Sequence, residues 1–208
     1  SSVAAVALSS PALAQDDTAT ENADDENVII VTGTAGGVGI RKQDAAFAIS
    51  SIDSSAIDQA GPQSTADVLA LVPGVSVETS GGQNGANIFV RGFPGGGDAE
   101  FVTFQYEGSP SFPPPTLSFL ENSQLFRLDE TVERVEAIRG GPAQVFSNGQ
   151  VGLTANFVTR KGGSDFGGLV KASITDFGDK RIDGVVHGPL GENTGFAVGG
   201  FFHSGEGV

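Results

Sequence analysis

VERVEAIRGGPAQVFSNGQVGLTANFVTRKGG, residues 132–163, decides the fold. It holds two short runs of β-prone residues, Val132–Ile138 and Leu153–Thr159, and charges of both signs alternate with apolar positions in the first run. Between them Gly140-Gly141-Pro142 forces a turn, because glycine accepts a positive φ and proline fixes its own. A second turn signal, Asn148-Gly149, comes before the second run. The stretch therefore predicts two strands separated by a tight, glycine-marked passage.

This stretch resembles the closing part of the plug domain of TonB-dependent outer-membrane receptors. The family pattern is a strand I-E-R-[IV]-E-V-[IL]-R-G-P, a small-residue turn that ends in Y-G, and then G-x-[IV]-N-[IV]-[IV]-T-[KR]. The corresponding residues here are Val132–Gly140, Phe146–Gly149 and Asn156–Arg160. The chain departs from the pattern by an extra glycine before the proline, by Phe146 in place of tyrosine, and by Ala155 in place of a β-branched aliphatic residue.

Further matches precede this stretch in the family's order. Residues 48–77, AISSIDSSAIDQAGPQSTADVLALVPGVSV, resemble the start of the same plug, and Ile88–Gly92 matches its I-x-[IV]-R-G strand. The resemblance implies an α+β plug domain with a small mixed sheet and short helices, followed by the first antiparallel strands of a transmembrane β-barrel.

Local signals in residues 48–77 predict the same elements. A strand over residues 47–52 leads into a brief helix that is capped by Asp53 or Ser54 and ends at Ala60. A second helix begins at the N-cap Ser64. Its buried face is predicted to consist of Val68, Leu69, Leu71 and Val72.

Between Phe93 and Arg127 the family pattern is weakest. Phe104–Pro110 stands where the family has a strand running into D-G-[VI]-P, and Pro113–Pro115 lies in a stiff, apolar loop. Aromatic residues in such loops can stack on an organic ligand, or they can simply wedge the plug into its surroundings. The residues predicted to face the substrate are Phe93, Tyr106, Phe112 and Phe119.

After Gly163 the pattern changes to a period of two. Leu169–Thr175, Ile182–His187 and Phe196–His203 each alternate larger apolar residues with small or polar ones. A membrane barrel offers such strands to lipid and lumen, although a soluble sandwich has the same period. Because the smallest such barrels have about eight strands, we expect these three to begin a longer barrel.

The N-terminal residues resemble the end of an export signal joined to a linker. Residues 1–8 are small and apolar, Pro11–Ala14 supplies a small-x-small cleavage pattern, and Asp16–Glu26 is an acidic run typical of a disordered linker. Val28–Thr32 then forms an isolated apolar run. It is either a first core strand or, as the resemblance implies, the TonB box that pairs with a partner's sheet edge. Its residues are Val28, Ile29, Ile30, Val31 and Thr32.

The amino-acid composition argues against several kinds of partner and activity. The net charge of −14 argues against nucleic acid as a partner. There is no cysteine, only two histidines are present, and no acid–base pair, triad or metal cluster emerges, so we predict no enzyme activity, no cofactor and no metal. The glycine-rich residues 33–39 are followed by Arg41-Lys42-Gln43 and do not match the phosphate-binding G-x-x-x-x-G-K-[ST] pattern.

The resemblance also implies an organisation and partners. The expected parts are a signal-peptide remnant (1–14), an acidic linker (15–26), the TonB box (27–34), the plug (35–163) and the first three barrel strands (164–208). In the family the plug fills the lumen of an outer-membrane barrel, substrate binds outside, and periplasmic TonB pulls the box. The plug charges expected to dock on the barrel wall, or else to stay solvated, are Arg91, Glu133, Arg134, Glu136 and Arg139.

The function this implies is TonB-dependent uptake of a scarce substrate across the outer membrane. An iron–siderophore complex is the first expectation for the substrate, with cobalamin or an oligosaccharide as alternatives. From the residues alone a second class stays open, an exported soluble β-rich binding or adhesion protein. Such a protein would also have an export signal, a net negative charge and strands that alternate apolar and polar residues. It would not explain why the plug motifs occur in the family's order.

Overall fold

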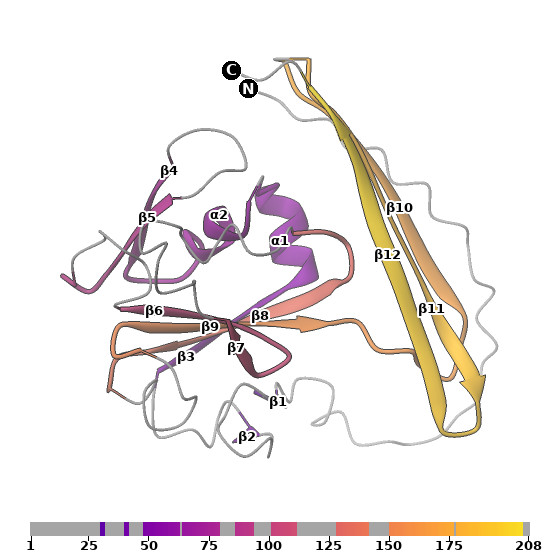
Figure 1. Ribbon diagram of the computed structural model, residues 1–208, viewed down its shortest axis with the longest axis horizontal. Coiled ribbons are helices and arrows are strands. Elements are labelled where there is room, and N and C mark those ends of the chain that lie inside the picture. Colours follow the sequence, from indigo (N-terminus) through magenta and orange to yellow (C-terminus); the bar gives the residue numbers. More distant parts are fainter. Residues whose placement is uncertain are drawn as a thin grey trace, which may run out of the picture.

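The computed structural model describes residues 30–31, 40–41, 48–62, 64–79, 86–93, 101–111, 128–141, 150–176 and 178–205. Figure 1 shows two parts. One is an α+β body, residues 48–163, and the other is a long three-stranded antiparallel sheet, residues 167–204, that stands beside it. The mixed sheet with short helices confirms the predicted fold class.

The body is built on a five-stranded sheet of order β3-β8-β9-β6-β7. The two strands expected from residues 132–163 form its centre, β8 (Val132–Arg139) beside β9 (Leu153–Thr159), and they pair antiparallel. β3 (Ile49–Asp53) adds antiparallel to β8, whereas β6 (Val102–Tyr106) pairs parallel with β9. β7 (Ser109–Ser111) closes the far edge as a hairpin with β6.

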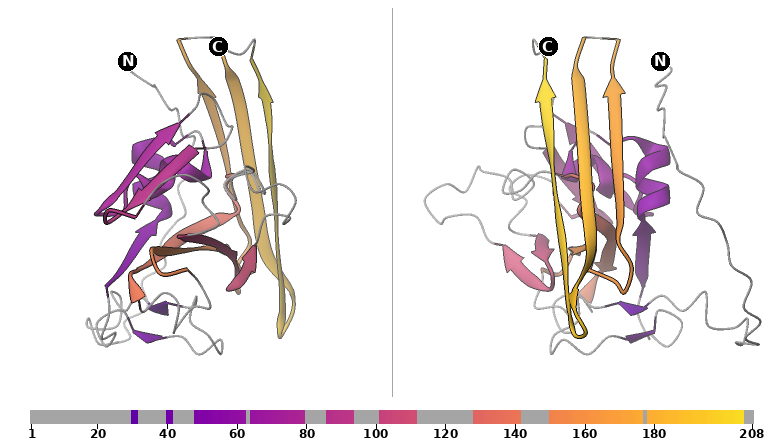
Figure 2. Two further views of the ribbon diagram at one scale, coloured as in Figure 1. Left: turned by 60° about the vertical axis from the view of Figure 1, so that its left-hand side comes forward. Right: turned by 90° about the vertical axis from the view of Figure 1, so that its right-hand side faces the viewer.

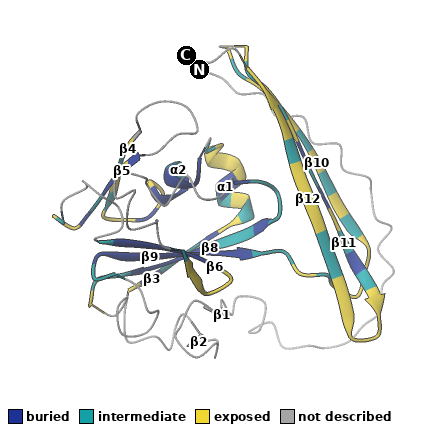
Figure 3. Cartoon of the chain, in the orientation of Figure 1, coloured by how far each residue is buried: buried dark blue, intermediate teal, exposed yellow. Residues whose placement is uncertain are grey.

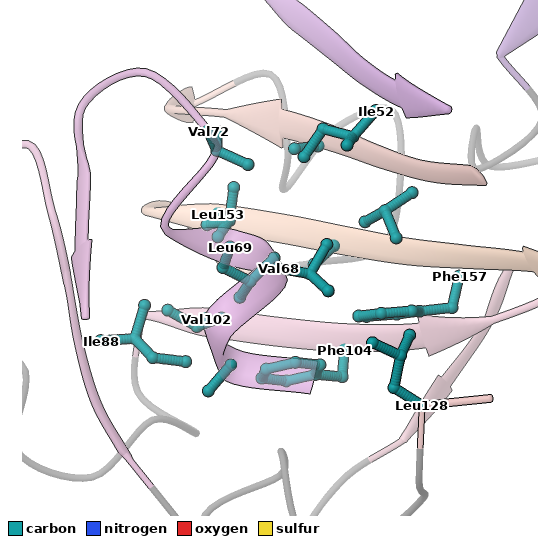
Figure 4. Close-up of a cluster of buried hydrophobic side chains, with 14 of the residues drawn as sticks. Ile52, Val68, Leu69, Val72, Ile88, Val102, Phe104, Leu128, Leu153 and Phe157 are labelled. Carbon is teal, nitrogen blue, oxygen red and sulfur yellow. The ribbon is translucent and has the colours of Figure 1, made fainter. Parts of the chain in front are cut away.

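The core lies between this sheet and the second helix (Figure 4). All six residues from Leu153 to Val158 are buried, as expected for a central strand covered on both faces. The rings of Phe104 and Phe157 stack with centroids 6.1 Å apart, and Val68 and Leu69 of the helix above them have no exposed surface. This packing fixes the positions of the body's loops and edges.

Both helices form where the capping residues predict. In α1 (Ser54–Ala60) the Asp53 carboxylate accepts a hydrogen bond from Ala56 N, and Gly61 ends the helix at φ +59°. In α2 (Thr65–Leu69) Ser64 and Asp67 form a reciprocal capping box. Neither of these described helices is long and apolar enough to cross a membrane.

Two predictions about this part of the body are wrong in detail. Leu71 is 39 % exposed and not part of a buried face, because α2 ends at Leu69 and the helical period no longer places residue 71, whereas Val72 is buried as predicted. The strand expected over Ile88–Gly92 ends at Val90, because Arg91 and Gly92 turn at positive φ (48° and 85°). That strand, β5 (Ala86–Val90), pairs with β4 (Val75–Thr79), as Figure 1 shows, and β1 (Ile30–Val31) pairs with β2 (Ile40–Arg41).

The second part of the chain forms the three strands that its alternation predicts, β10 (Gly167–Ile174), β11 (Lys180–Gly191) and β12 (Thr194–Ser204). β11 continues through residues 188–191, beyond the alternating run Ile182–His187 that predicted it. Pro189 is tolerated there because the pairing with β10 stops at His187, so its missing N–H interrupts no hydrogen bond to that strand.

Candidate functional site

The two faces of the three-stranded sheet differ in chemistry. The face turned away from the body, here called the outer face, carries large apolar side chains that are 54–69 % exposed (Figure 3). These are Val170, Ile174, Ile182, Val186, Leu190, Val198 and Phe202. The inner face, turned toward the body in the views of Figure 2, carries polar residues at the alternate positions, among them Lys171 on β10 and Arg181 on β11.

The inner face contacts the body through Leu128–Thr131, the segment that precedes β8. Arg181 Nη2 donates to the Leu128 carbonyl oxygen at 2.5 Å, and Lys171 Nζ lies 3.3 Å from Glu130 Oε1. Within the body, Arg160, which follows β9, donates through Nε to the Glu130 carbonyl oxygen at 2.9 Å and fixes this segment. The sheet thus supplies cations and the body supplies oxygen acceptors.

Lys171 bridges two elements of the body. Its Nζ lies 2.6 Å from Asp58 Oδ1 on α1 as well as 3.3 Å from Glu130. The side chain of Glu130 is only 11 % exposed, and burial raises its pKa above the ordinary value of 4.5, although Lys171 opposes this. The ammonium therefore holds α1 and the segment before β8 to the same point of the sheet.

Arg181 is fixed on three sides. It forms a bidentate pair with Asp183, two residues along β11, with contacts of 2.6 to 3.0 Å. Its guanidinium carbon lies 4.2 Å from the centroid of the Phe201 ring on β12. With Nε and Nη2 both bonded to Asp183, Nη2 also donates to the Leu128 carbonyl oxygen, so the geometry of this bond to the body is set within the sheet.

Glycines allow the backbones of the two parts to touch. A Cβ on Gly195 of β12 would lie 2.5 Å from the carbonyl oxygen of Gly162, and a Cβ on Gly162 would collide with Phe196 N. A Cβ on Gly199 would meet Thr131 Cγ2 at 2.6 Å. No side chain fits at these positions without displacing the body from the sheet.

Three of the residues predicted to dock on the barrel make contacts within the body. Arg134 pairs with Glu136 at 2.9 Å and with Glu133 at 3.7 Å. The fully buried Glu136 also accepts a hydrogen bond from Asn156 Nδ2 at 3.1 Å. These contacts tie the three charges to one another and to β9.

Arg139, also predicted to dock, donates to Ser50 Oγ at 3.0 Å and to the Pro73 carbonyl oxygen at 2.5 Å. Burial and then the charge of Arg91 lower its pKa. The backbone N–H of Arg91 donates to the Gly74 carbonyl oxygen at 3.2 Å, so both arginines meet the turn at Pro73–Gly74. Among the described residues the Nε of Arg139 is buried without a hydrogen-bond partner. A role for these residues toward the rest of a barrel remains a prediction.

The other predicted sites are only partly described. Phe93 stacks on Phe101 with centroids 5.0 Å apart, just before β6, whereas Tyr106 is 43 % exposed at the opposite end of that strand. The structure therefore does not bring Phe93 and Tyr106 together, and the predictions for Phe112 and Phe119 lie outside the described residues. Of the predicted TonB-binding run, Ile30 and Val31 form β1, and Val28, Ile29 and Thr32 are outside the described part.

Sequence reasoning missed the contact made by Lys171, Asp58, Glu130 and Arg181. The available signal was the alternation itself, which placed Lys171 on the polar side of its strand, but nothing local pointed from there to α1. Among the described residues, no three histidine, aspartate or glutamate side chains gather as a metal site.

An α+β body beside a sheet with one apolar, exposed face agrees with the predicted fold class, a plug domain followed by barrel strands. Consistent with this, the sequence model of the TonB-dependent Receptor Plug Domain matches residues 41–154. The chain belongs to this family, which consists of receptors and not of enzymes.

Solved structures share the fold. The alcaligin outer-membrane receptor FauA from Bordetella pertussis matches with a TM-score of 0.66 and 21 % identity over 88 % of this chain and 31 % of its own. The ferripyoverdine receptor of the Pseudomonas aeruginosa outer membrane matches with a TM-score of 0.66 and 22 % identity, over 84 % of this chain and 24 % of its own. The ferric yersiniabactin uptake receptor FyuA from Yersinia pestis matches with a TM-score of 0.60 and 21 % identity, over 74 % of this chain and 24 % of its own.

The chain thus spans between about a quarter and a third of the length of these relatives. No curated protein matches it. At these identities the likeness establishes the fold alone.

Proposed function

We propose that this chain is the gating plug and the first wall of a TonB-dependent transporter in the outer membrane. Residues 35–163 would be the plug and residues 164–208 the first three barrel strands. The observation that carries the proposal is the polarity of the three-stranded sheet, with ion pairs to the body on one face and exposed apolar side chains on the other. A lipid-facing barrel strand has this polarity, because its outer residues meet hydrocarbon and its inner ones a polar lumen.

The proposed substrate is a ferric siderophore complex. Support comes from the names of relatives that share the fold, which are receptors for ferripyoverdine and ferric yersiniabactin. In this proposal the substrate meets aromatic residues on the side of the plug away from the periplasm. The residues concerned are Phe93, Phe112 and Phe119, whereas Tyr106, predicted together with them, lies at the opposite end of β6 from Phe93 and would not share this contact.

The proposed energy coupling runs through Val28–Thr32, facing the periplasm. An extended run of five residues spans about 17 Å at roughly 3.3 Å per residue, enough for several main-chain hydrogen bonds to a sheet edge of TonB. The extended backbone of Ile30–Val31 is compatible with such pairing. Charged plug residues, above all the neighbouring Arg91 and Arg139, would hold the plug to parts of the barrel beyond this chain.

The test uses the full-length receptor in cells with and without TonB. Ile30→Pro removes an N–H and fixes φ, so it should abolish uptake of an iron-labelled siderophore while surface binding stays normal. Ile30→Ala keeps the backbone donor and should retain most uptake. Loss of surface binding or of folding in the proline variant would make Val28–Thr32 an ordinary core strand. Recovery of the receptor in the soluble fraction would favour the exported soluble protein instead.

A further inference from the structure

A buried polar row crosses the five-stranded sheet on the face opposite to the core. In Figure 4 the rings of Phe104 and Phe157 point into the core, so the neighbouring residues of these strands point to the other face. There Glu136 of β8 lies opposite Asn156 of β9, which lies opposite Gln105 of β6. All three residues are at most 1 % exposed, although none is apolar. Because polar groups are costly to bury unless they are hydrogen-bonded, the partners of this row show what it holds in place.

The row fixes which way the side-chain amide of Asn156 points. One oxygen of the Glu136 carboxylate accepts from Asn156 Nδ2 at 3.1 Å, and the other accepts from Arg134 Nε at 3.0 Å. Because an ionised carboxylate can only accept, the amide turns its nitrogen to Glu136 and its oxygen away from it. That oxygen accepts from the backbone N–H of Gly108 at 2.8 Å. The buried charge thus determines which atom of Asn156 faces the turn between β6 and β7.

This turn needs support from outside the hairpin. Glu107 and Gly108 both have a positive φ, 53° and 76°, a turn that strongly favours asparagine, aspartate or glycine at its first position over glutamate. Both residues donate their backbone N–H to β9, Glu107 to the Phe157 carbonyl oxygen at 3.0 Å and Gly108 to Asn156 Oδ1. The hairpin is therefore attached to β9 at its turn as well as along β6.

The return strand of this hairpin runs toward the side of the plug proposed to meet the substrate. β7 pairs antiparallel with β6, and its last residue, Ser111, lies opposite Phe104. It therefore runs from the turn back toward the end of β6 at which Phe93 stacks on Phe101. The residue that follows β7 in the sequence is Phe112, one of the residues proposed to contact the substrate.

We propose that Asn156 is a positioning residue for substrate binding, because it holds the turn at Gly108 and so sets the position of β7 and of the chain that continues at Phe112. Asn156 itself is buried and does not touch the substrate. Glu136 acts through Asn156 by fixing the orientation of its amide. The inference rests on the proposed function, because the position of β7 matters for uptake only if the substrate is bound on this side of the plug.

The experiment compares Asn156→Ala with Val158→Ala in the full-length receptor. Asn156→Ala should speed hydrogen exchange of the Gly108 amide about threefold to tenfold, since one neutral hydrogen bond is lost. Affinity for ferripyoverdine or ferric yersiniabactin, whichever the receptor binds, should fall by a similar factor, while the uptake rate at saturating siderophore stays unchanged. Val158 lies on the same strand and face, is 4 % exposed, and has an apolar side chain that cannot bond to the turn. Val158→Ala should lower the amount of folded receptor, but it should leave the affinity per folded receptor, and the exchange at Gly108 relative to β9, unchanged.

A further variant tests the role of the buried charge. In Glu136→Gln the new amide can offer either its nitrogen or its oxygen to Asn156, so the orientation of Asn156 is no longer fixed, and affinity should fall in the same direction but by less. Unchanged exchange at Gly108 in Asn156→Ala, an equal change in Val158→Ala, or unchanged siderophore affinity overturns the inference. If the unmodified receptor binds neither siderophore, the proposed substrate fails, and exchange at Gly108 still decides whether Asn156 holds the turn.

Discussion

The five-stranded sheet of the body and the three-stranded sheet beside it use β-prone sequences in opposite ways. In β9 six successive residues are buried, so both faces of the strand lie in the core. In β10 exposure alternates residue by residue, and the apolar side chains of Val170 and Ile174 stand at exposed positions. The body resembles the inside of a soluble protein, whereas the three-stranded sheet has its apolar side outward.

This inversion sets the kind of contact that joins the two parts. Because the three-stranded sheet presents polar residues to the body, the parts meet through ion pairs, carbonyl contacts and glycines instead of through a shared apolar core. Such contacts are worth less than core packing and reform readily in water. In the gating role proposed above, the body would have to stay folded while its contacts with the sheet release, and this division of forces suits both requirements.

The largest effect is expected in the core of the body. Phe157→Ala removes a fully buried ring that stacks on Phe104, and it should destabilise the body by about 3–5 kcal/mol. Phe202→Ala, on the outer face of the other sheet, is 68 % exposed and should leave the stability of the body unchanged. The loss of stability in each variant is measured by hydrogen exchange of the β9 amides in the full-length receptor. Equal loss of protection in both variants would remove the distinction between the two sheets.

Most of the contrast between the buried sheet of the body and the alternating three-stranded sheet could be predicted from the sequence. Capping residues and turn glycines located α1, α2 and the two central strands, because these signals act within a few residues. Alternation located β10, β11 and β12 for the same reason. Leu71 was misplaced because the apolar period continues past the point where α2 ends, and only the packing of the chain reveals that end.

The contacts between the two sheets could not be predicted in the same way. Lys171 and Asp58 lie 113 residues apart in the chain, and no local pattern links them. Glu136, one of the charges predicted to dock on the barrel wall or to stay solvated, shows the same limit. Its burial depends on Asn156 of β9, twenty residues away, as well as on the nearby Arg134.

The outer face provides the next test. Val198→Arg places a charge among exposed apolar side chains of β12, and if this face meets lipid it should cost about 2–4 kcal/mol of insertion free energy. Val198→Leu is the matched control and should insert normally. The measurement is the folded, heat-modifiable fraction of the full-length receptor in lipid vesicles. Normal insertion of the arginine variant would mean that this face does not lie in hydrocarbon.

A smaller effect is expected at the glycines that join the two parts. Gly195→Ala introduces a Cβ 2.5 Å from the Gly162 carbonyl oxygen, and overpacking of this kind costs about 1–3 kcal/mol. Gly200→Ala, on the same strand with no atom within 4 Å of the added carbon, should cost nothing measurable. Separation of the body from the three-stranded sheet is measured as the protease sensitivity of residues 160–166. Equal behaviour of the two variants would show that this close backbone contact is not needed.

The smallest effect tests how the end of β9 is held. Burial opposes ionisation of Glu107, but hydrogen bonds from Lys161 and Thr159 outweigh it and hold its pKa below the ordinary value of 4.5. A carboxylate with a lowered pKa stabilises the fold above that value, and the contribution is lost as the pH falls through the lowered pKa. Because the side chain of Glu107 is 33 % exposed, the contribution stays below ~1 kcal/mol.

Acidification below pH 4.5 should therefore loosen the hairpin of β6 and β7 from the end of β9, while the hydrogen bond from Gly108 N to Asn156 Oδ1 at 2.8 Å gives the hairpin a second attachment to β9. Glu107→Gln should show the loosened state already at neutral pH and lose the pH dependence. Hydrogen exchange of the Thr159 amide, which donates to Glu107 Oε1 at 2.5 Å, reports the change directly. An amide equally protected at pH 7 in both proteins would show that β-sheet pairing, and not the charge of Glu107, holds this end of the body.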